Sequence, residues 1–180
     1  MRKILVSQFL TLDGIMDGPE KWNPEYSGDS EVVHEILADL SASDLLLLGR
    51  TSYDFFAARW PSRTNAMADY FNNLPKLVVS TRLQKPEWNN TTIIRSTAVE
   101  EIKKRKEQPG KNILVIGSHK LVQTLMSENL IDEYKLYVYP LTLGKGKRLF
   151  EQGAAEQALE LISAKRFASG VVSIMYQSGK

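Results

Sequence analysis

The chain has 180 residues, 43% of them hydrophobic and 24% charged, a composition that excludes a disordered or fibrous protein. Its 23 basic and 21 acidic residues give a net charge of +2, so no nucleic-acid partner is expected, and the absence of cysteine excludes disulfides, thiolate metal sites and cysteine nucleophiles. No apolar run is long enough to span a membrane, and no signal-peptide cleavage pattern is present. We therefore expect one soluble, cytoplasmic domain over residues 1–180 without a membrane partner.

The first half of the chain alternates apolar strands with amphipathic helices. Four consecutive leucines at 45–48 are typical of a strand buried on both faces. The loop over 11–28 is long and rich in Gly and Pro, which indicates a functional segment, with simple flexibility as the alternative. The predicted elements are, in chain order, a strand over 3–9, a helix over 31–40 capped by Asp29 or Ser30, a strand over 45–48, and helices over 50–59 and 62–72.

The second half repeats this alternation, which predicts an α/β fold with a mostly parallel central sheet flanked by helices. The last two strands have no helix between them, so we expect an antiparallel C-terminal strand pair at a sheet edge. The predicted elements are strands over 76–80 and 92–95, a helix over 99–107, a strand over 112–116, a helix over 119–128, a strand over 133–139, and a final pair over 159–168 and 171–177.

Three predicted strands end in polar motifs. Gly49 follows the leucine strand, and Arg50 and Thr51 open the next helix, where free backbone amides attract phosphate; the alternative is a tight turn with Thr51 as a cap. The strand KLVVSTR ends in Ser80, Thr81 and Arg82, which suit a ribose phosphate but are also ordinary loop residues. In ILVIGSHK, Gly117, Ser118, His119 and Lys120 open another helix. Because ligands bind beyond the carboxyl ends of parallel strands, the three motifs together predict one extended anionic ligand, a dinucleotide, although the GxGxxG fingerprint is absent.

Several segments follow one another in the order of a known family. They are SQFLTLDG, LLLLGRTSYD, KLVVSTR, ILVIGSHKLVQTLMSENLIDEYKLYVYPLTLGKGKRLF and the closing strand pair. In these segments, which cover nearly the whole chain, it resembles the dihydrofolate reductase-like superfamily, and more narrowly the C-terminal reductase domain of the bifunctional riboflavin-biosynthesis deaminase-reductase. The family commonly has Gly-Gly where this chain has Gly117-Ser118.

The resemblance implies a dihydrofolate reductase-like fold and an NADPH-binding reductase. Gly49, Arg50 and Thr51 would contact the cofactor phosphates, and Ser80, Thr81 and Arg82 would lie near the adenosine 2′-phosphate. The segment from Ile116 to Leu121 would line the pyrophosphate and the nicotinamide ribose. Its residues are Ile116, Gly117, Ser118, His119, Lys120 and Leu121.

Three further residues are candidates for contact with the substrate. Asp13 lies in the loop that the resemblance places beside the nicotinamide pocket, so it is the candidate for catalysis and substrate binding; an Asp-Gly turn is the alternative. Gln8 is a polar residue on the first strand that could face the substrate pocket. Trp22 is either an aromatic lid or an anchor of its loop.

Other charged residues have simpler interpretations. Asp17 is predicted to be a turn residue, and Asp29 and Glu31 to serve the start of a helix. His34 lies off its apolar stripe and is expected to face solvent, and no metal-ligand spacing surrounds it or His119, so no metal is predicted. The basic residues of the LGKGKR segment either bind a substrate phosphate or solvate a turn; they are Lys145, Lys147 and Arg148.

Taken together, these features predict an NADPH-dependent reductase of a small pterin-like or pyrimidine-like heterocycle. By resemblance its reaction is most like that of 5-amino-6-(5-phosphoribosylamino)uracil reductase or of dihydrofolate reductase. The alternative is a non-catalytic nucleotide-binding or dimerisation module that retains the fold. Because related reductases are typically dimers, the resemblance also implies a homodimer.

Overall fold

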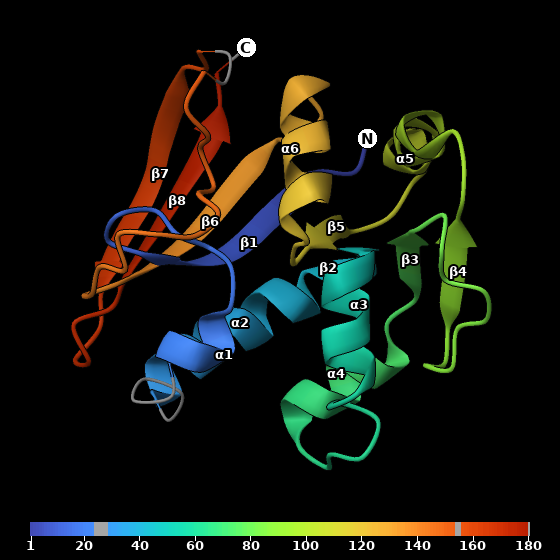
Figure 1. The fold of residues 1–180 in the computed structure, drawn as a ribbon, viewed down its shortest axis with the longest axis horizontal. Coiled ribbons are helices and arrows are strands. Elements are labelled where there is room, and N and C mark those ends of the chain that lie inside the picture. Colours follow the sequence, from blue (N-terminus) through green and yellow to red (C-terminus); the bar gives the residue numbers. More distant parts are fainter. Residues whose placement is uncertain (24–28, 154–155, 180) are drawn as a thin grey trace.

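A computed structural model describes residues 1–23, 29–153 and 156–179 (Figure 1). The strands are β1 (Ile4–Thr11), β2 (Ser43–Gly49), β3 (Lys76–Val79), β4 (Thr91–Ile94), β5 (Asn112–Val115), β6 (Glu133–Tyr139), β7 (Leu159–Arg166) and β8 (Val172–Ser178). The helices are α1 (Pro19–Trp22), α2 (Ser30–Ser41), α3 (Arg50–Ala57), α4 (Ala66–Asn73), α5 (Ala98–Glu107) and α6 (His119–Ser127). Within the described ranges, none of these helices has the length and apolar character that a bilayer crossing demands.

All eight strands form one sheet in the order β4-β3-β2-β5-β1-β6-β8-β7. Pairs among the first six strands are parallel, whereas β8 pairs antiparallel with both β6 and β7. This order confirms the predicted fold class. The antiparallel C-terminal pair lies at an edge of the sheet as predicted, but residues 171–177 are not the edge strand, because β8 lies between β6 and β7. The more apolar VSIMYQS takes the inner position, and the more polar LELISAKR is left outside, with residues 160–166 exposed.

Two predicted segments differ from the structure by more than two residues. Inside the predicted loop over 11–28, a short helix, α1, begins with Pro19, a residue whose fixed φ suits the first helical turn. The helix predicted over 62–72 begins only at Ala66, because the Asn65 side chain accepts a hydrogen bond from Ala68 N at 2.9 Å and so caps the helix there. The part of the predicted loop over 24–28 lies outside the described residues.

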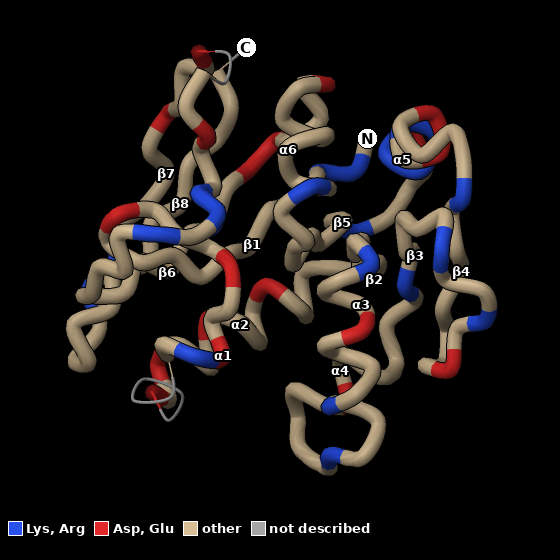
Figure 2. Tube along the Cα trace, viewed as in Figure 1, with Lys and Arg blue, Asp and Glu red and all other residues tan. Residues whose placement is uncertain are grey.

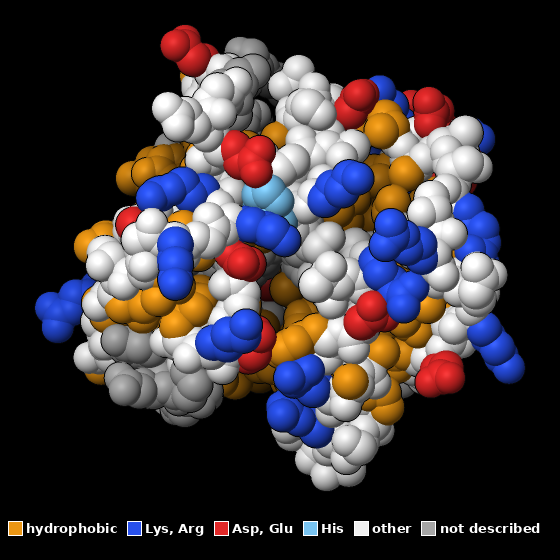
Figure 3. Space-filling view, in the orientation of Figure 1, with side chains coloured by type: hydrophobic (Ala, Val, Ile, Leu, Met, Phe, Trp, Pro, Cys, Tyr) orange, Lys and Arg blue, Asp and Glu red, His pale blue; other side chains and the backbone are white. Residues whose placement is uncertain are grey.

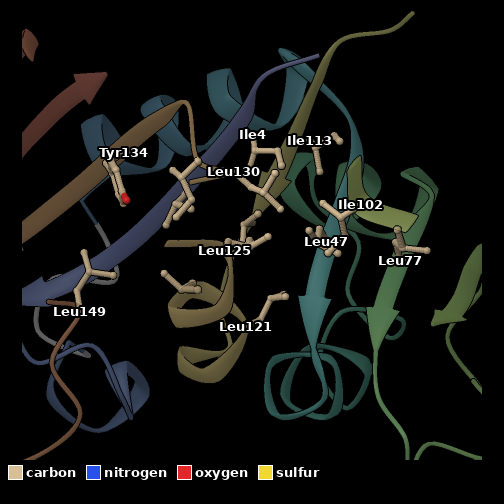
Figure 4. Close-up of a cluster of buried hydrophobic side chains, with 14 of the residues drawn as sticks. Ile4, Leu47, Leu77, Ile102, Ile113, Leu121, Leu125, Leu130, Tyr134 and Leu149 are labelled. Atoms are coloured by element: carbon tan, nitrogen blue, oxygen red, sulfur yellow. The ribbon is translucent and has the colours of Figure 1, made fainter. Parts of the chain in front are cut away.

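The core has a layer on each face of the sheet. Helices α5 and α6 cover one face, in the cluster drawn in Figure 4, and α2, α3 and α4 cover the other. Successive strand residues point to opposite faces, so the four leucines of β2 serve both layers: Leu45 and Leu47 join the α6 layer, and Leu46 and Leu48 the α2 layer. The carboxyl end of this two-sided strand lies between those of its neighbours β3 and β5.

Candidate functional site

The three polar motifs meet at one edge of the sheet. Because β3, β2 and β5 are adjacent and parallel, the segments that follow them emerge side by side. Gly49 N donates a hydrogen bond to Gly117 O at 3.2 Å, which joins the end of β2 to the segment after β5. The structure thus brings the first and third motifs into contact and places the second on the neighbouring strand, while a common ligand stays a prediction. Figure 3 shows that the middle of this face is hollowed.

Two glycines make this junction possible. An ideal Cβ on Gly49 would lie 2.0 Å from Ser118 Oγ and 2.9 Å from Ser118 Cβ, and one on Gly117 would lie 2.5 Å from Ser52 Oγ. Gly117 also has a φ of 68°, a region that L side chains rarely adopt. The lack of a side chain at both strand ends therefore makes room for two serines, Ser118 beside Gly49 and Ser52 beside Gly117. The sequence marked both glycines, but the steric role of Ser52 was missed because nothing local in the sequence signals it.

Two helices begin at this junction without a side-chain cap. Gly49 is the N-cap of α3 and Ser118 is that of α6, and no described side chain caps either helix. Free N-terminal amides carry partial positive charge and bind anions. Arg50 adds a guanidinium, whose Nε donates to both carboxylate oxygens of Asp54 at 2.6 and 2.7 Å, and Thr51 is exposed. The arrangement therefore suits a bridging phosphate group.

The turn after β3 presents Arg82 on its surface. Ser80 is buried, and its Oγ accepts hydrogen bonds from Arg82 N at 3.2 Å and Leu83 N at 3.0 Å, so it shapes the turn. Arg95 supports the same turn by donating to Leu83 O at 2.7 Å and to Gln84 O at 2.9 Å. Thr81 and Arg82 are exposed. Sequence reasoning missed Arg95, although an arginine directly after β4 is a signal of the same kind as Arg82.

Some residues at the start of α6 are accessible to a ligand, and others are buried in the core. His119 Nε2 lies 3.0 Å from Arg148 O and 3.1 Å from Glu151 Oε1, so its ring secures the loop that follows β6. Lys120 is exposed, whereas the side chain of Leu121 is buried in the α6 layer and can offer only its backbone to a ligand. Ile116 packs against the opposite layer.

Asp13 joins two loops. Its carboxylate accepts hydrogen bonds from Thr11 Oγ1 at 2.6 Å, Gly144 N at 2.8 Å and Leu143 N at 3.3 Å. These donors, Thr11 foremost, lower the pKa of Asp13 to about 2. The carboxylate is ionised near neutral pH and does not donate a proton there, so the geometry favours the turn alternative. Any substrate contact of Asp13 stays a prediction.

The segment LGKGKR packs against the loop that contains Asp13. Ile15 forms an antiparallel bridge with Arg148, and Asp17 Oδ1 accepts from Lys147 N at 2.5 Å. A Cβ on Gly146 would lie 2.6 Å from Ile15 Cγ2, so the two loops touch directly. Lys145 and Lys147 remain exposed on a loop that its backbone anchors, which agrees with a solvated turn. Figure 2 shows basic and acidic positions interspersed along the chain around this junction.

Several aromatic rings form a cluster on the α2 side of the sheet, near the carboxyl end of β1. The ring centroid of Phe9 lies 5.5 Å from that of Tyr137 and 5.3 Å from that of Tyr139, which lies 5.3 Å from that of Trp22. Trp22 Nε1 donates to Asp17 O at 3.1 Å, so the indole anchors its loop on this cluster. Its predicted role as a lid stays untested. Sequence reasoning missed the other three rings because they lie on strands assigned only to the core.

A buried polar network lies beneath α2. The Asp39 carboxylate accepts hydrogen bonds from Tyr137 Oη at 3.1 Å and Ser7 Oγ at 3.4 Å. Nearby, Glu35 pairs with Lys135 at 2.8 Å and Lys165 at 3.2 Å. Burial raises the pKa of Asp39 to about 6, and the charge of Lys135 and the hydrogen bond from Tyr137 only partly oppose it. Asp39 therefore takes up a proton within a mildly acidic range.

This network predicts a pH-dependent stability. Because the pKa of Asp39 is higher in the folded than in the unfolded chain, the folded state retains a proton that the unfolded state loses between about pH 4 and pH 6. Stability relative to an Asp39→Asn variant is expected to fall as pH rises through this window, by up to about 3 kcal/mol. Urea unfolding of both proteins at several pH values measures the difference. Parallel pH profiles for the two proteins would contradict the assignment.

Comparison with protein families matches residues 2–173 to the family described as the RibD C-terminal domain. The chain is 32% identical over 187 residues to the uncharacterized protein YyaP of Bacillus subtilis (strain 168), covering 97% of this chain and 94% of YyaP. It is 26% identical over 173 residues to the uncharacterized protein YwjB of the same organism, covering 94% and 95% of the two chains.

Solved structures share the fold. A protein of Shewanella sp. PV-4 named for riboflavin biosynthesis superposes with a TM-score of 0.76 at 20% identity, over 99% of both chains. A pyrimidine reductase-like protein of Corynebacterium diphtheriae gives a TM-score of 0.69 at 11% identity, over 99% of this chain and 92% of that one. The diaminohydroxyphosphoribosylaminopyrimidine deaminase/5-amino-6-(5-phosphoribosylamino)uracil reductase of Thermotoga maritima gives 0.69 at 13% identity, over 99% of this chain and 57% of that one.

Proposed function

The chain belongs to the family of RibD C-terminal domains, and from this premise we propose that it is an NADPH-dependent reductase of a small nitrogen heterocycle. Its reaction would be most like that of 5-amino-6-(5-phosphoribosylamino)uracil reductase. The observation that carries the proposal is the meeting of two helix N-termini without side-chain caps, which Gly49 and Gly117 allow to pack closely together. Free amides at such N-termini bind the phosphates of a dinucleotide.

The residues present suit the phosphate groups of NADPH at two places. The amides at the start of α3 and α6 would hold the bridging phosphates, with Arg50 as an added donor. Arg82, exposed on a turn that Ser80 and Arg95 support, would meet the 2′-phosphate. When bound, the cofactor supplies a hydride. The chain's part is to orient it and to exclude water, with the loops around Asp13 and Gly144 held together at the rim.

A second candidate is a nucleotide-binding module without chemistry. The observation that favours it is the state of Asp13, whose carboxylate is occupied by three donors and ionised near neutral pH. Under this alternative the protein would bind NADPH but would not oxidise it with any pyrimidine or pterin substrate. Turnover therefore separates the two candidates, and binding alone does not.

The first experiment is a titration of the purified protein with NADPH and, in parallel, with NADH, followed by nucleotide fluorescence. We expect micromolar affinity for NADPH and much weaker binding of NADH. A screen of aminopyrimidine and pterin compounds for NADPH oxidation then tests the reductase. If neither nucleotide binds, the cofactor assignment is wrong and the fold serves another purpose.

We also propose that the protein is a homodimer joined through β7. This edge strand exposes Leu161 (55%) and Ile162 (45%), an arrangement that invites pairing with another strand. Its sequence is self-complementary, because antiparallel pairing of two copies would bring Glu160 of one strand near Lys165 and Arg166 of the other.

Light scattering on the eluting protein measures the oligomeric state. We expect the mass of two chains for the native protein and of one chain for Ile162→Lys, because a charged side chain at the centre of an edge strand opposes pairing with another strand. Ser169→Lys, at an exposed position in the adjoining turn, serves as the control and should remain dimeric. A native protein that is monomeric at high concentration would contradict the dimer.

A further inference from the structure

Gln8 is a buried residue whose side-chain amide nitrogen lacks a partner among the described residues. Its residue is 7% exposed, and its side-chain nitrogen has no hydrogen-bond acceptor among the described residues. An unsatisfied buried donor costs about 1–3 kcal/mol, so such groups are rare in native proteins unless something else binds them. Leucine or methionine would fill this position on β1 without that cost.

Gln8 lies on β1 at the point where the neighbouring strands β1 and β5 separate. The pairing of β1 with β5 ends at Val6 and Val115, whereas the pairing with β6 continues to Thr11 and Tyr139. Gln8 therefore lies just beyond the point where β1 and β5 separate. At this point the chain leaves β5 for Gly117 and the start of α6.

The side of the sheet that Gln8 faces is set by strand alternation. Gln8 shares its face with Val6 and Leu10, which belong to the α6 layer, and it is in register with Leu136 of the same layer. Its neighbours Ser7 and Phe9 point to the opposite face, toward the Asp39 network and the aromatic rings. The amide is thus on the side of α6, whose N-terminus belongs to the proposed cofactor site.

We infer that the Gln8 side chain binds the carboxamide of the nicotinamide ring, a role that rests on the proposed function. A carboxamide carries one carbonyl acceptor and an NH₂ donor, and the amide of Gln8 offers the complementary pair. This reciprocal pairing would fix the rotation of the ring and hence the face that it turns toward the substrate. The sequence-based expectation that Gln8 faces the substrate pocket stays a prediction beside this assignment.

The test compares stability with affinity in Gln8→Met, a change of similar length that removes only the amide. We expect an unchanged or higher melting temperature, because the unsatisfied donor is gone, and a Kd for NADPH raised about five- to tenfold. Binding of 2′-phospho-ADP-ribose, which lacks nicotinamide, should be unchanged. Calorimetric titration with both compounds measures the two affinities.

Gln123→Met is the matched control. Gln123 Nε2 donates to Leu149 O at 2.8 Å, so the same change there removes a satisfied bond and should lower the melting temperature. If Gln8→Met lowers the melting temperature and leaves NADPH affinity unchanged, Gln8 is structural and the inference is wrong. Equal weakening of both compounds also overturns it. If the native protein binds neither compound, the proposed function fails and the inference falls with it.

Discussion

Replacing Gly49 by alanine is expected to abolish measurable NADPH binding and to lower the free energy of unfolding by about 1–3 kcal/mol. Gly49 has φ −79° and ψ 164°, a conformation open to any residue, so the change carries no backbone penalty. The cost is steric, since the new Cβ would lie 2.0 Å from Ser118 Oγ. Relief of this contact must move the start of α6, where the phosphate-binding amides are.

The double variant Gly49→Ala, Ser118→Gly tests this explanation. Removing the serine side chain eliminates the contacts at 2.0 and 2.9 Å and leaves one at 3.0 Å to the backbone nitrogen. We expect most of the stability and a measurable part of the NADPH affinity to return, so that the two changes are strongly non-additive. Denaturant unfolding and nucleotide titration of the single and double variants form the measurement. An additive loss in the double variant would show that Gly49 acts for another reason.

Replacing Arg82 by alanine is expected to raise the Kd for NADPH about 10- to 100-fold and to leave the Kd for NADH unchanged. Charge-assisted hydrogen bonds to phosphate are the stronger class, and only NADPH has a 2′-phosphate for Arg82 to meet. The turn itself should persist, because Ser80 Oγ and Arg95 hold it through backbone atoms. The loss should therefore appear as a change of nucleotide preference.

Lys85→Ala is the matched control for this prediction. Lys85 is an exposed cation three residues further along the same loop, so it shares the general field of the site but not the proposed contact. We expect it to change NADPH affinity little, and that small effect to vanish at high salt. Equal losses for NADPH and NADH in Arg82→Ala, or equal effects of the two variants, would remove Arg82 from the 2′-phosphate site.

Much of the fold follows from local patterns in the sequence. The alternation of apolar strands and amphipathic helices predicts the α/β class, and the leucine run at 45–48 predicts a strand buried on both faces, as β2 is. The turn and cap residues at Gly49 and Gly117 mark strand ends correctly. These features depend on residues close together in the chain, where side-chain period and backbone preference decide the outcome.

The tertiary structure decided which of the marked residues are free to act. Ser80 and Asp13 have the chemistry of binding residues, yet the hydroxyl of one and the carboxylate of the other are occupied by hydrogen bonds within the protein. Two of the three hydrogen-bond donors to Asp13, Leu143 and Gly144, lie about 130 positions away in the chain. Such contacts depend on which strands neighbour each other, and the period of a single strand does not specify that.

What the sequence determined by itself was therefore the set of elements, the class of fold and the places where chemistry could occur. The inner position of β8, the close contact between Gly49 and Ser118 and the unpartnered amide of Gln8 were decided by the register and order of the sheet. The physical reason is the distance along the chain over which each kind of interaction acts. Helix caps and strand periods act over a few residues, whereas the contacts that occupy or free a side chain form between segments that only the folded sheet brings together.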